Sequence, residues 1–150
     1  PSNDLPFANS PMDHIFIVIL ATPDREATVA WYRDVLHLDV GDTYTIAYSM
    51  INNAFGLPSD NMSSLTMVQN GRMPIVEIDD YPPQTKLRRA DPGCLPPGNS
   101  LVTLIVDSLD AIETDWIGRP AYLPGPLYTG SRSATVLGPA GELLELVEHA

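Results

Sequence analysis

The chain has 150 residues, 44% of them apolar and 18% charged, which is the size and composition of one globular domain. A chain of this length needs neither a disulfide framework nor a structural metal to fold. Eight lysines and arginines against 19 acidic residues give a net charge of −11, so we expect no nucleic acid and no membrane as partner. Cys94 is the only cysteine and no signal peptide or transmembrane segment is recognisable, which predicts a cytoplasmic protein.

The first elements expected along the chain are an arm, a strand and a helix. Residues 1–11 contain three prolines and are expected to form an extended N-terminal arm. Residues 14–20 are rich in β-branched side chains and predict a strand. Thr22 is expected to cap a helix that ends near Leu36. Its core side is predicted to carry Ala27, Trp31 and Val35, and its water side Arg25, Arg33 and Asp34.

Three short β-prone segments follow the helix and complete the first half of the chain. Asn70-Gly71 is typical of a hairpin turn between the last two of them. Residues 81–99 hold five prolines and two glycines and are interpreted as a connector. The three predicted strands cover residues 43–50, 64–69 and 74–79.

The second half repeats this plan of strand, helix and three strands. Ser108 is expected to cap a short helix that presents Leu109, Ile112 and Trp116 on one face. Residues 139–141 predict a turn before the last strand. The predicted strands cover residues 101–106, 120–128, 133–136 and 143–147, the second being the least clearly marked. The sequence therefore predicts an α+β fold made of two tandem βαβββ modules.

Two carboxylates stand inside otherwise apolar closing strands, Glu77 in the first half and Glu145 in the second. A buried carboxylate must find a partner or raise its pKa, because an unpaired buried charge is costly. An exposed sheet face with ordinary polar alternation explains the pattern equally well. His14 opens the first predicted strand and is interpreted either as a structural residue or as a metal ligand. With the two glutamates, an imidazole would suit Mn, Fe, Co, Ni or Zn.

Four segments resemble the vicinal oxygen chelate superfamily, which includes glyoxalase I, extradiol dioxygenases and the fosfomycin- and bleomycin-resistance proteins. They are Asp13-His14-Ile15 and residues 30–36 (AWYRDVL), 106–110 (VDSLD) and 138–146 (GPAGELLEL). The resemblance implies one domain over residues 12–150, with module one at 12–80 and module two at 100–150. It also implies that the mixed sheet of these modules curls into a cup around a central site.

The resemblance also implies a set of site residues. Members of the superfamily commonly place metal ligands on the first and fourth strands of each module. In this sequence the positions are assigned to His14, Glu77, Leu101 and Glu145. Leucine cannot ligate a metal, so the predicted set is His14, Glu77 and Glu145, which is a weaker site than one with two histidines. The predicted substrate pocket consists of Tyr44, Tyr48, Met50, Met67, Leu101 and Tyr128.

Two functions are consistent with these residues. The first is a glyoxalase-like, metal-assisted isomerase, lyase or dioxygenase that acts on a small oxygen-bearing substrate, with Glu77 or Glu145 as a catalytic proton carrier. The second is a metal-free small-molecule-binding module similar to bleomycin-resistance proteins, which Leu101 favours. A homodimer is expected in either case. Because the chain begins at Pro1 without methionine, it is also interpreted as one part of a longer tandem protein.

Overall fold

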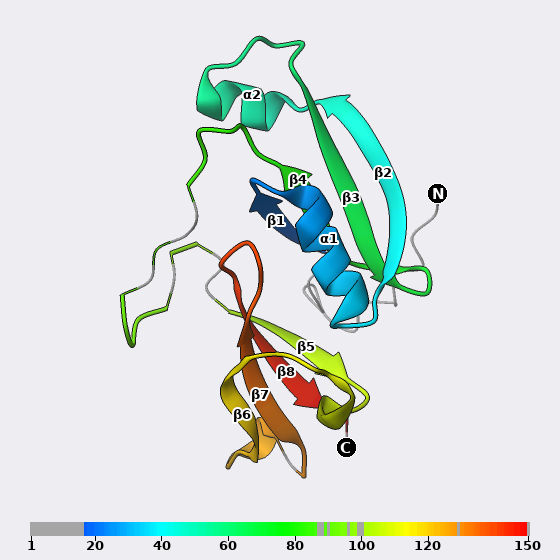
Figure 1. Ribbon diagram of the computed structural model, residues 1–150, viewed down its shortest axis with the longest axis vertical. Helices are drawn as coiled ribbons and strands as arrows, with labels where there is room; N and C mark the ends of the chain where they lie inside the picture. Colours follow the sequence, from blue (N-terminus) through cyan, green and yellow to red (C-terminus); the bar gives the residue numbers. More distant parts are fainter. Residues whose placement is uncertain are drawn as a thin grey trace. The chain divides into compact units, whose positions relative to one another are not determined.

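The computed structural model divides into two units, Pro1–Lys86 and Leu87–Ala150, and Figure 1 shows the elements of each. It describes residues 17–86, 89, 91–95, 97–98, 101–128 and 130–149. The predicted arm at 1–11 and His14 lie outside the described residues. No helix in the described part of the chain is long and apolar enough to cross a membrane.

The first unit is a four-stranded mixed sheet with two helices. Its strand order is β1-β4-β3-β2, with β1 parallel to β4 and the other neighbours antiparallel. The βαβββ plan predicted from the sequence is therefore confirmed. The helix α2 was not predicted and occupies the place where the segment 43–50 was expected to continue as strand. The elements are β1 (Val18–Thr22), α1 (Arg25–Asp34), β2 (Asp39–Ala47), α2 (Ser49–Phe55), β3 (Met62–Asn70) and β4 (Met73–Asp80).

Helix α1 begins two residues later than predicted. Asp24 is its N-cap, and the Asp24 carboxylate accepts a hydrogen bond from the backbone N–H of Ala27 at 3.0 Å. Thr22, the predicted cap, is the last residue of β1 and pairs with Asp80 of β4. The Thr22 hydroxyl instead lies 3.0 Å from the hydroxyl of Thr28. The strand pairing of Thr22 therefore sets where the helix starts.

The buried side of α1 also differs from the predicted one. Ala27 is exposed, and Trp31 and Val35 are only half-buried. The Thr28 hydroxyl donates to the backbone carbonyl of Asp24 at 2.7 Å, so a polar side chain can be buried at low cost. The fully buried residues of α1 are Thr28, Val29 and Tyr32.

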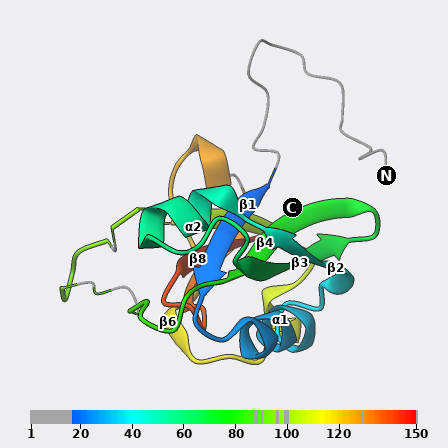
Figure 2. The ribbon, with the colours of Figure 1, turned by 90° about the horizontal axis from the view of Figure 1, so that it is seen from above.

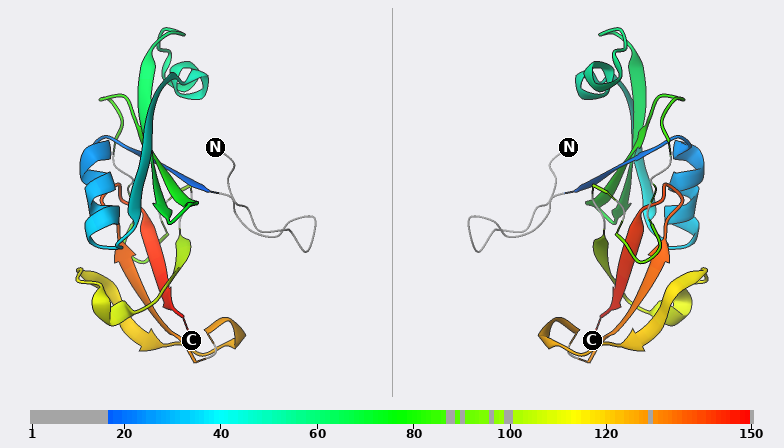
Figure 3. Two further views of the ribbon diagram at one scale, coloured as in Figure 1. Left: turned by 90° about the vertical axis from the view of Figure 1, so that its right-hand side faces the viewer. Right: turned by 90° about the vertical axis from the view of Figure 1, so that its left-hand side faces the viewer.

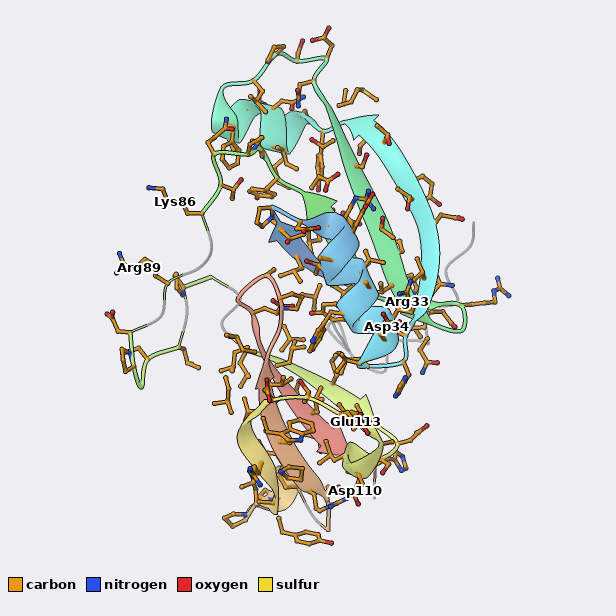
Figure 4. The ribbon with its side chains drawn as sticks, viewed as in Figure 1. Arg33, Asp34, Lys86, Arg89, Asp110 and Glu113 are labelled. Carbon is orange, nitrogen blue, oxygen red and sulfur yellow. The ribbon has the colours of Figure 1, made fainter. Side chains whose placement is uncertain are left out.

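Arg25 packs against the sheet, although it was expected to face water. Its guanidinium donates to Asp80 at 3.2 Å and to the hydroxyl of Thr66 at 2.6 Å. These bonds tie the first turn of α1 to strands β3 and β4. The remaining basic residue near this helix, Arg33, faces solvent as predicted and pairs with its neighbour Asp34, as Figure 4 shows at the end of α1.

The two faces of this sheet have different surroundings. Helix α1 covers the face that carries Val76, which is 1% exposed, and Thr66, which Arg25 contacts. Side chains alternate along a strand, so Glu77 and Asp79 lie on the opposite face. Figures 2 and 3 show α2 on this opposite side of the sheet from α1.

Strands β3 and β4 form the predicted hairpin. Asn70 pairs with Met73, so the turn consists of Gly71 and Arg72. Gly71 has a φ of 59°, which glycine adopts without steric cost.

The second unit has the same sheet plan as the first. Its strand order is β5-β8-β7-β6, with β5 parallel to β8 and the other pairs antiparallel. The internal duplication is therefore confirmed. The predicted helix is a single 3-10 turn, and Trp116 belongs to the next strand instead of the helix. The elements are β5 (Val102–Val106), η1 (Leu109–Ala111), β6 (Trp116–Tyr122), η2 (Pro126–Tyr128), β7 (Arg132–Leu137) and β8 (Leu143–Glu148).

An ion-pair cluster holds the short turn η1 in place. Arg132 donates to Glu148 at 2.7 Å and to both carboxylate oxygens of Asp110 at 3.0 Å. Glu148 also accepts the backbone N–H of Leu109 at 3.1 Å, whereas the side chain of Ser108 makes no capping bond. Figure 4 shows Asp110 at this turn. The carboxylate of Glu148 thus takes the role that was predicted for Ser108.

Candidate functional site

Glu77 and Glu145 occupy equivalent positions in the two units. Glu77 of β4 pairs with Ile19 of β1, and Glu145 of β8 pairs with Thr103 of β5. Each glutamate therefore lies on the fourth strand of its unit, directly opposite the first strand. This agrees with the equivalence predicted from the sequence.

The same register corrects the assignment of the first-strand positions. Leu101 lies two residues before Thr103, so its equivalent in the first unit is Ile17, two residues before Ile19. His14 is three residues further toward the N-terminus and is not the counterpart of Leu101. The first-strand position that is equivalent in the two units is therefore apolar in both: it is Ile17 in the first unit and Leu101 in the second.

Glu145 is a carboxylate held by three hydroxyl groups. Its Oε2 accepts from the Thr103 hydroxyl at 2.7 Å, and its Oε1 accepts from Tyr128 at 2.7 Å and Ser133 at 3.0 Å. Burial raises the pKa of Glu145, but the three hydrogen bonds outweigh it and hold this pKa below its ordinary value. The bond to Glu145 raises the pKa of Tyr128. The structure thus shows a hydrogen bond between Tyr128, a predicted pocket residue, and Glu145, a predicted catalytic residue.

Glu77 has a different neighbour, a second carboxyl group. Asp79 lies two residues further along β4 on the same face and is 2% exposed, and its Oδ1 has no hydrogen-bond partner. Burial and then the neighbouring Glu77 raise the pKa of Asp79 to about 7. Asp79 is therefore about half protonated near neutral pH.

The charges of Glu77 and Asp79 both act on the hydroxyl group of Tyr48. Burial is the main cause that raises the pKa of Tyr48, followed by the charges of Asp79 and Glu77. Tyr48 precedes α2, so this helix brings an aromatic ring to the carboxyl face of the sheet. Met67 pairs with Glu77 in the β3–β4 ladder and lies on the same face. The predicted pocket residue Met67 therefore lies beside Glu77, and the charge of Glu77 acts on the predicted pocket residue Tyr48.

The other predicted pocket residues of the first unit are more exposed. Tyr44 is 41% exposed, and its hydroxyl donates to Asp42 at 3.1 Å. Met50 is 57% exposed on α2. In the second unit, Leu101 precedes β5 and is 43% exposed. His14, Glu77 and Glu145 are spread over the undescribed arm and two separate units, so their convergence stays a prediction.

Three residues of these sites were not identified from the sequence. Thr103 and Ser133 are ordinary strand residues, and only the pairing of β5 and β7 with β8 shows that they contact Glu145. Asp79 did have a signal, because it stands two residues after Glu77 in an apolar strand. The sequence placed it on the same face but did not indicate that it would be more buried than Glu77.

The first unit also has an open cavity of about 260 Å³ at the end of β3 and β4. Met62, Ser63, Asp80 and Tyr81 are among its lining residues, whereas Glu77 and Asp79 are not. Its Asp80 is already paired with Arg25. We therefore place the candidate chemistry at the carboxyl groups of the sheet face and not in this cavity.

The donor set of the described residues does not fit a divalent metal ion. No three His, Cys, Asp or Glu side chains of that part of the chain are grouped so that they could hold one. Both oxygens of Glu145 already accept hydroxyl protons, and Ile17 and Leu101 offer no donor atom.

Comparison with solved structures identifies the fold. No protein-family model and no curated protein sequence matches the chain. A glyoxalase-family protein from Bacillus cereus is similar with a TM-score of 0.65 and 15% identity, covering 95% of this chain and 98% of that one. A glyoxalase-family protein from Enterococcus faecalis has a TM-score of 0.56 and 17% identity, covering 90% and 97%.

A third similar structure is a member of the glyoxalase/bleomycin resistance protein/dioxygenase superfamily from Sphaerobacter thermophilus. Its TM-score is 0.53 and its identity 16%, covering 91% of this chain and 97% of that one. Each of the three covers at least 90% of this chain. The chain therefore has the fold of the glyoxalase/bleomycin resistance protein/dioxygenase superfamily, as its resemblance to the vicinal oxygen chelate proteins predicts.

Proposed function

We propose that this chain binds a small apolar or aromatic molecule without the help of a metal ion. The observation that carries the proposal is the apolar pair Ile17 and Leu101, which stand at equivalent first-strand positions of the two units. A metal site built on first and fourth strands needs donor atoms there. Aliphatic side chains offer contact area to a ligand instead.

The sheet face of the second unit that carries Glu145 also carries apolar side chains, which favours an apolar ligand. Leu101, Thr103 and Ile105 alternate with the inward residues of β5, so they share this face with Glu145. Ile105 is 73% exposed and Leu101 is 43% exposed. These two aliphatic side chains give a ligand apolar contact area on the face that carries Glu145.

The hydroxyl-bonded Glu145 supplies the polar group that such a site needs for orientation. Its bonds to Thr103, Tyr128 and Ser133 fix the carboxylate and the tyrosine ring in one arrangement. Ligand sites commonly combine apolar walls with a few fixed polar groups. The charge of Glu145 is retained at neutral pH because its pKa is lowered.

Calorimetric titration with benzyl alcohol and phenethyl alcohol in the presence of EDTA tests this proposal. Both alcohols are expected to bind, and saturation with Mn²⁺, Co²⁺, Ni²⁺ or Zn²⁺ is expected to leave the affinity unchanged. Ile105→Asp should weaken binding, because it places a charge in the apolar wall. Leu95→Asp, at a connector residue that is 60% exposed, is the matched control. Binding that appears only after metal is added would contradict the proposal.

A second candidate is the metal-assisted isomerase, lyase or dioxygenase. The equivalent placement of Glu77 and Glu145 favours it, because both glutamates stand at the fourth-strand positions expected of ligands. His14 would have to add an imidazole. Elemental analysis of protein purified without chelator or affinity tag separates the two candidates. A stoichiometric metal that is lost in Glu145→Ala would establish this second function.

A further inference from the structure

A row of polar side chains crosses the second sheet at the level of Glu145. Glu145 of β8 pairs with Thr103 of β5 on one side and with Thr135 of β7 on the other. Thr135 in turn pairs with Gly118 of β6. Residues that pair directly point to the same face of a sheet, so the three side chains share one face. The polar row therefore lies next to the exposed aliphatic side chains that the proposed function assigns to the ligand.

The three hydroxyl groups bonded to Glu145 have no proton left for a ligand. An ionised carboxylate can only accept hydrogen bonds, so the hydroxyls of Thr103, Tyr128 and Ser133 must each donate to it. A hydroxyl has a single proton, and in each of these groups the bond to Glu145 uses it. Toward a ligand these groups can therefore act only as acceptors.

The carboxylate of Glu145 can still accept one more hydrogen bond. Each carboxylate oxygen has about two acceptor positions. Within the described part of the chain, Oε1 accepts from both Tyr128 and Ser133, whereas Oε2 accepts only from Thr103, at 2.7 Å. Thr103 is exposed and stands between the two exposed aliphatic side chains of this face. The unfilled acceptor position thus lies beside the apolar wall.

Thr135 is the hydroxyl of the row that has a proton to give. It is half-buried, and its side chain makes no hydrogen bond with another described residue. A Cβ added to Gly118 would lie 3.1 Å from the Thr135 hydroxyl, so the glycine leaves this hydroxyl uncovered from the side of β6. Thr135 can therefore donate to a ligand. It is neutral, however, and hydrogen bonds to a charged group such as Glu145 are stronger.

The charge of this face favours the same ligand chemistry. Glu145 is ionised at neutral pH, because its pKa lies below the ordinary value. Its three hydrogen-bond partners are all neutral, and the chain as a whole has a net charge of −11. An acidic ligand would therefore be repelled, whereas a hydrogen-bond donor would be attracted.

We propose that the ligand of this chain donates a hydrogen bond to Glu145 Oε2, and that molecules of the same shape with only acceptor groups bind more weakly. The inference rests on the proposed function and restricts its ligands to apolar or aromatic molecules that carry a hydroxyl or N–H group and no acidic group. Thr103, Tyr128 and Ser133 are positioning residues, because they fill the other acceptor positions of the carboxylate and hold it in place.

Calorimetric titration with two probes of the same carbon skeleton tests the inference. They are α-methylbenzyl alcohol, which can donate a hydrogen bond, and acetophenone, which can only accept one. In EDTA at neutral pH the alcohol is expected to bind about tenfold or more tightly than the ketone, as expected for a hydrogen bond to a charged group. Benzoate, which is anionic at this pH, is expected to bind more weakly than the alcohol.

Two variants separate Glu145 from the neighbouring hydroxyl. Glu145→Gln should remove the preference for the alcohol, because an amide is neutral and can donate as well as accept. Thr135→Val should weaken binding of the ketone alone, so the preference for the alcohol should widen. Glu113→Gln is the control, because Glu113 is an exposed acid of the same unit just after η1 (Figure 4) and the change in net charge is the same.

The outcomes distinguish this inference from the proposed function. Equal binding of the alcohol and the ketone without metal, or a preference that survives in Glu145→Gln, would overturn the inference and leave the proposed function intact. A preference that narrows in Thr135→Val would assign the recognition to Thr135 and also overturn the inference. Failure of both probes and of benzyl alcohol to bind would overturn the inference and the proposed function together.

Discussion

Replacing Asp79 with asparagine is expected to stabilise the protein above neutral pH and to leave it almost unchanged under mildly acidic conditions. Asp79 is 2% exposed, and burial together with Glu77 raises its pKa from 3.8 to about 7. Between these two values the folded protein holds a proton that the unfolded chain has lost. The unfolding free energy of the wild type must therefore fall as the pH rises through this interval.

The magnitude follows from the two pKa values. A pKa difference of one unit corresponds to about 1.4 kcal/mol, so the cost of ionising Asp79 reaches at most about 4 kcal/mol above pH 7. Asparagine has the same shape and stays neutral, so it avoids this cost at every pH. The stability advantage of Asp79→Asn should therefore grow from near zero at about pH 4 to its full value at about pH 8.

Urea unfolding followed by circular dichroism across this pH range measures the difference between the variant and the wild type. Asp60→Asn removes the same charge at an exposed position and serves as the reference for general electrostatic repulsion. A difference between Asp79→Asn and wild type that does not change with pH would refute the reasoning. It would mean that Asp79 has the same pKa in the folded and the unfolded protein.

Three further predictions concern the second unit. Arg132→Met should lower the unfolding free energy, because it leaves two carboxylates without their partner, and urea unfolding checks this. Tyr128→Phe should raise the pKa of Glu145 by removing one of its three donors, which a carboxyl-carbon NMR titration would detect, and an unchanged pKa would contradict it. Leu101→His should bind Co²⁺ more tightly than the wild type, because it places an imidazole on the face of the second sheet that carries Glu145, and unchanged binding would contradict this.

The plan of each unit was predictable because its signals are local. The alternation of apolar residues and the Asn70-Gly71 turn predicted the hairpin of β3 and β4 without knowledge of the rest of the fold. The helix α2 was not predictable in this way. Its buried residues are Ile51 and Asn52, and the Asn52 side chain donates to the backbone carbonyl of Asn61 at 2.9 Å. The sequence of α2 has no long run of apolar residues at helical spacing. The helix depends instead on the contact between Asn52 and the loop that follows it.

The predicted start of α1 and the predicted equivalence of His14 and Leu101 differ from the structure for the same physical reason. Thr22 and Asp24 are both good N-caps, and the pairing of Thr22 with Asp80 in the sheet decides between them. In the same way, the equivalent of Leu101 depends on which residues of β1 and β5 face the fourth strands. A strand sequence alone does not fix its register against a partner more than 40 residues away, and a shift of three positions made His14 seem equivalent to Leu101.

The register also explains why the two equivalent glutamates differ. Glu145 has Thr103 beside it on the first strand of its unit and Ser133 diagonally on the third, and both donate to its carboxylate. The corresponding positions around Glu77 are the apolar residues Ile19 and Leu65.

Glu77 therefore has no hydroxyl donors on the neighbouring strands, and the nearest polar group on its own strand is a second acid, Asp79. Glu145 is therefore stabilised by hydroxyl donors of its own unit, whereas Glu77 shares a hydrogen bond with the second acid, Asp79. This asymmetry arises because Ile19 and Leu65 of the first unit stand at the positions that Thr103 and Ser133 occupy in the second.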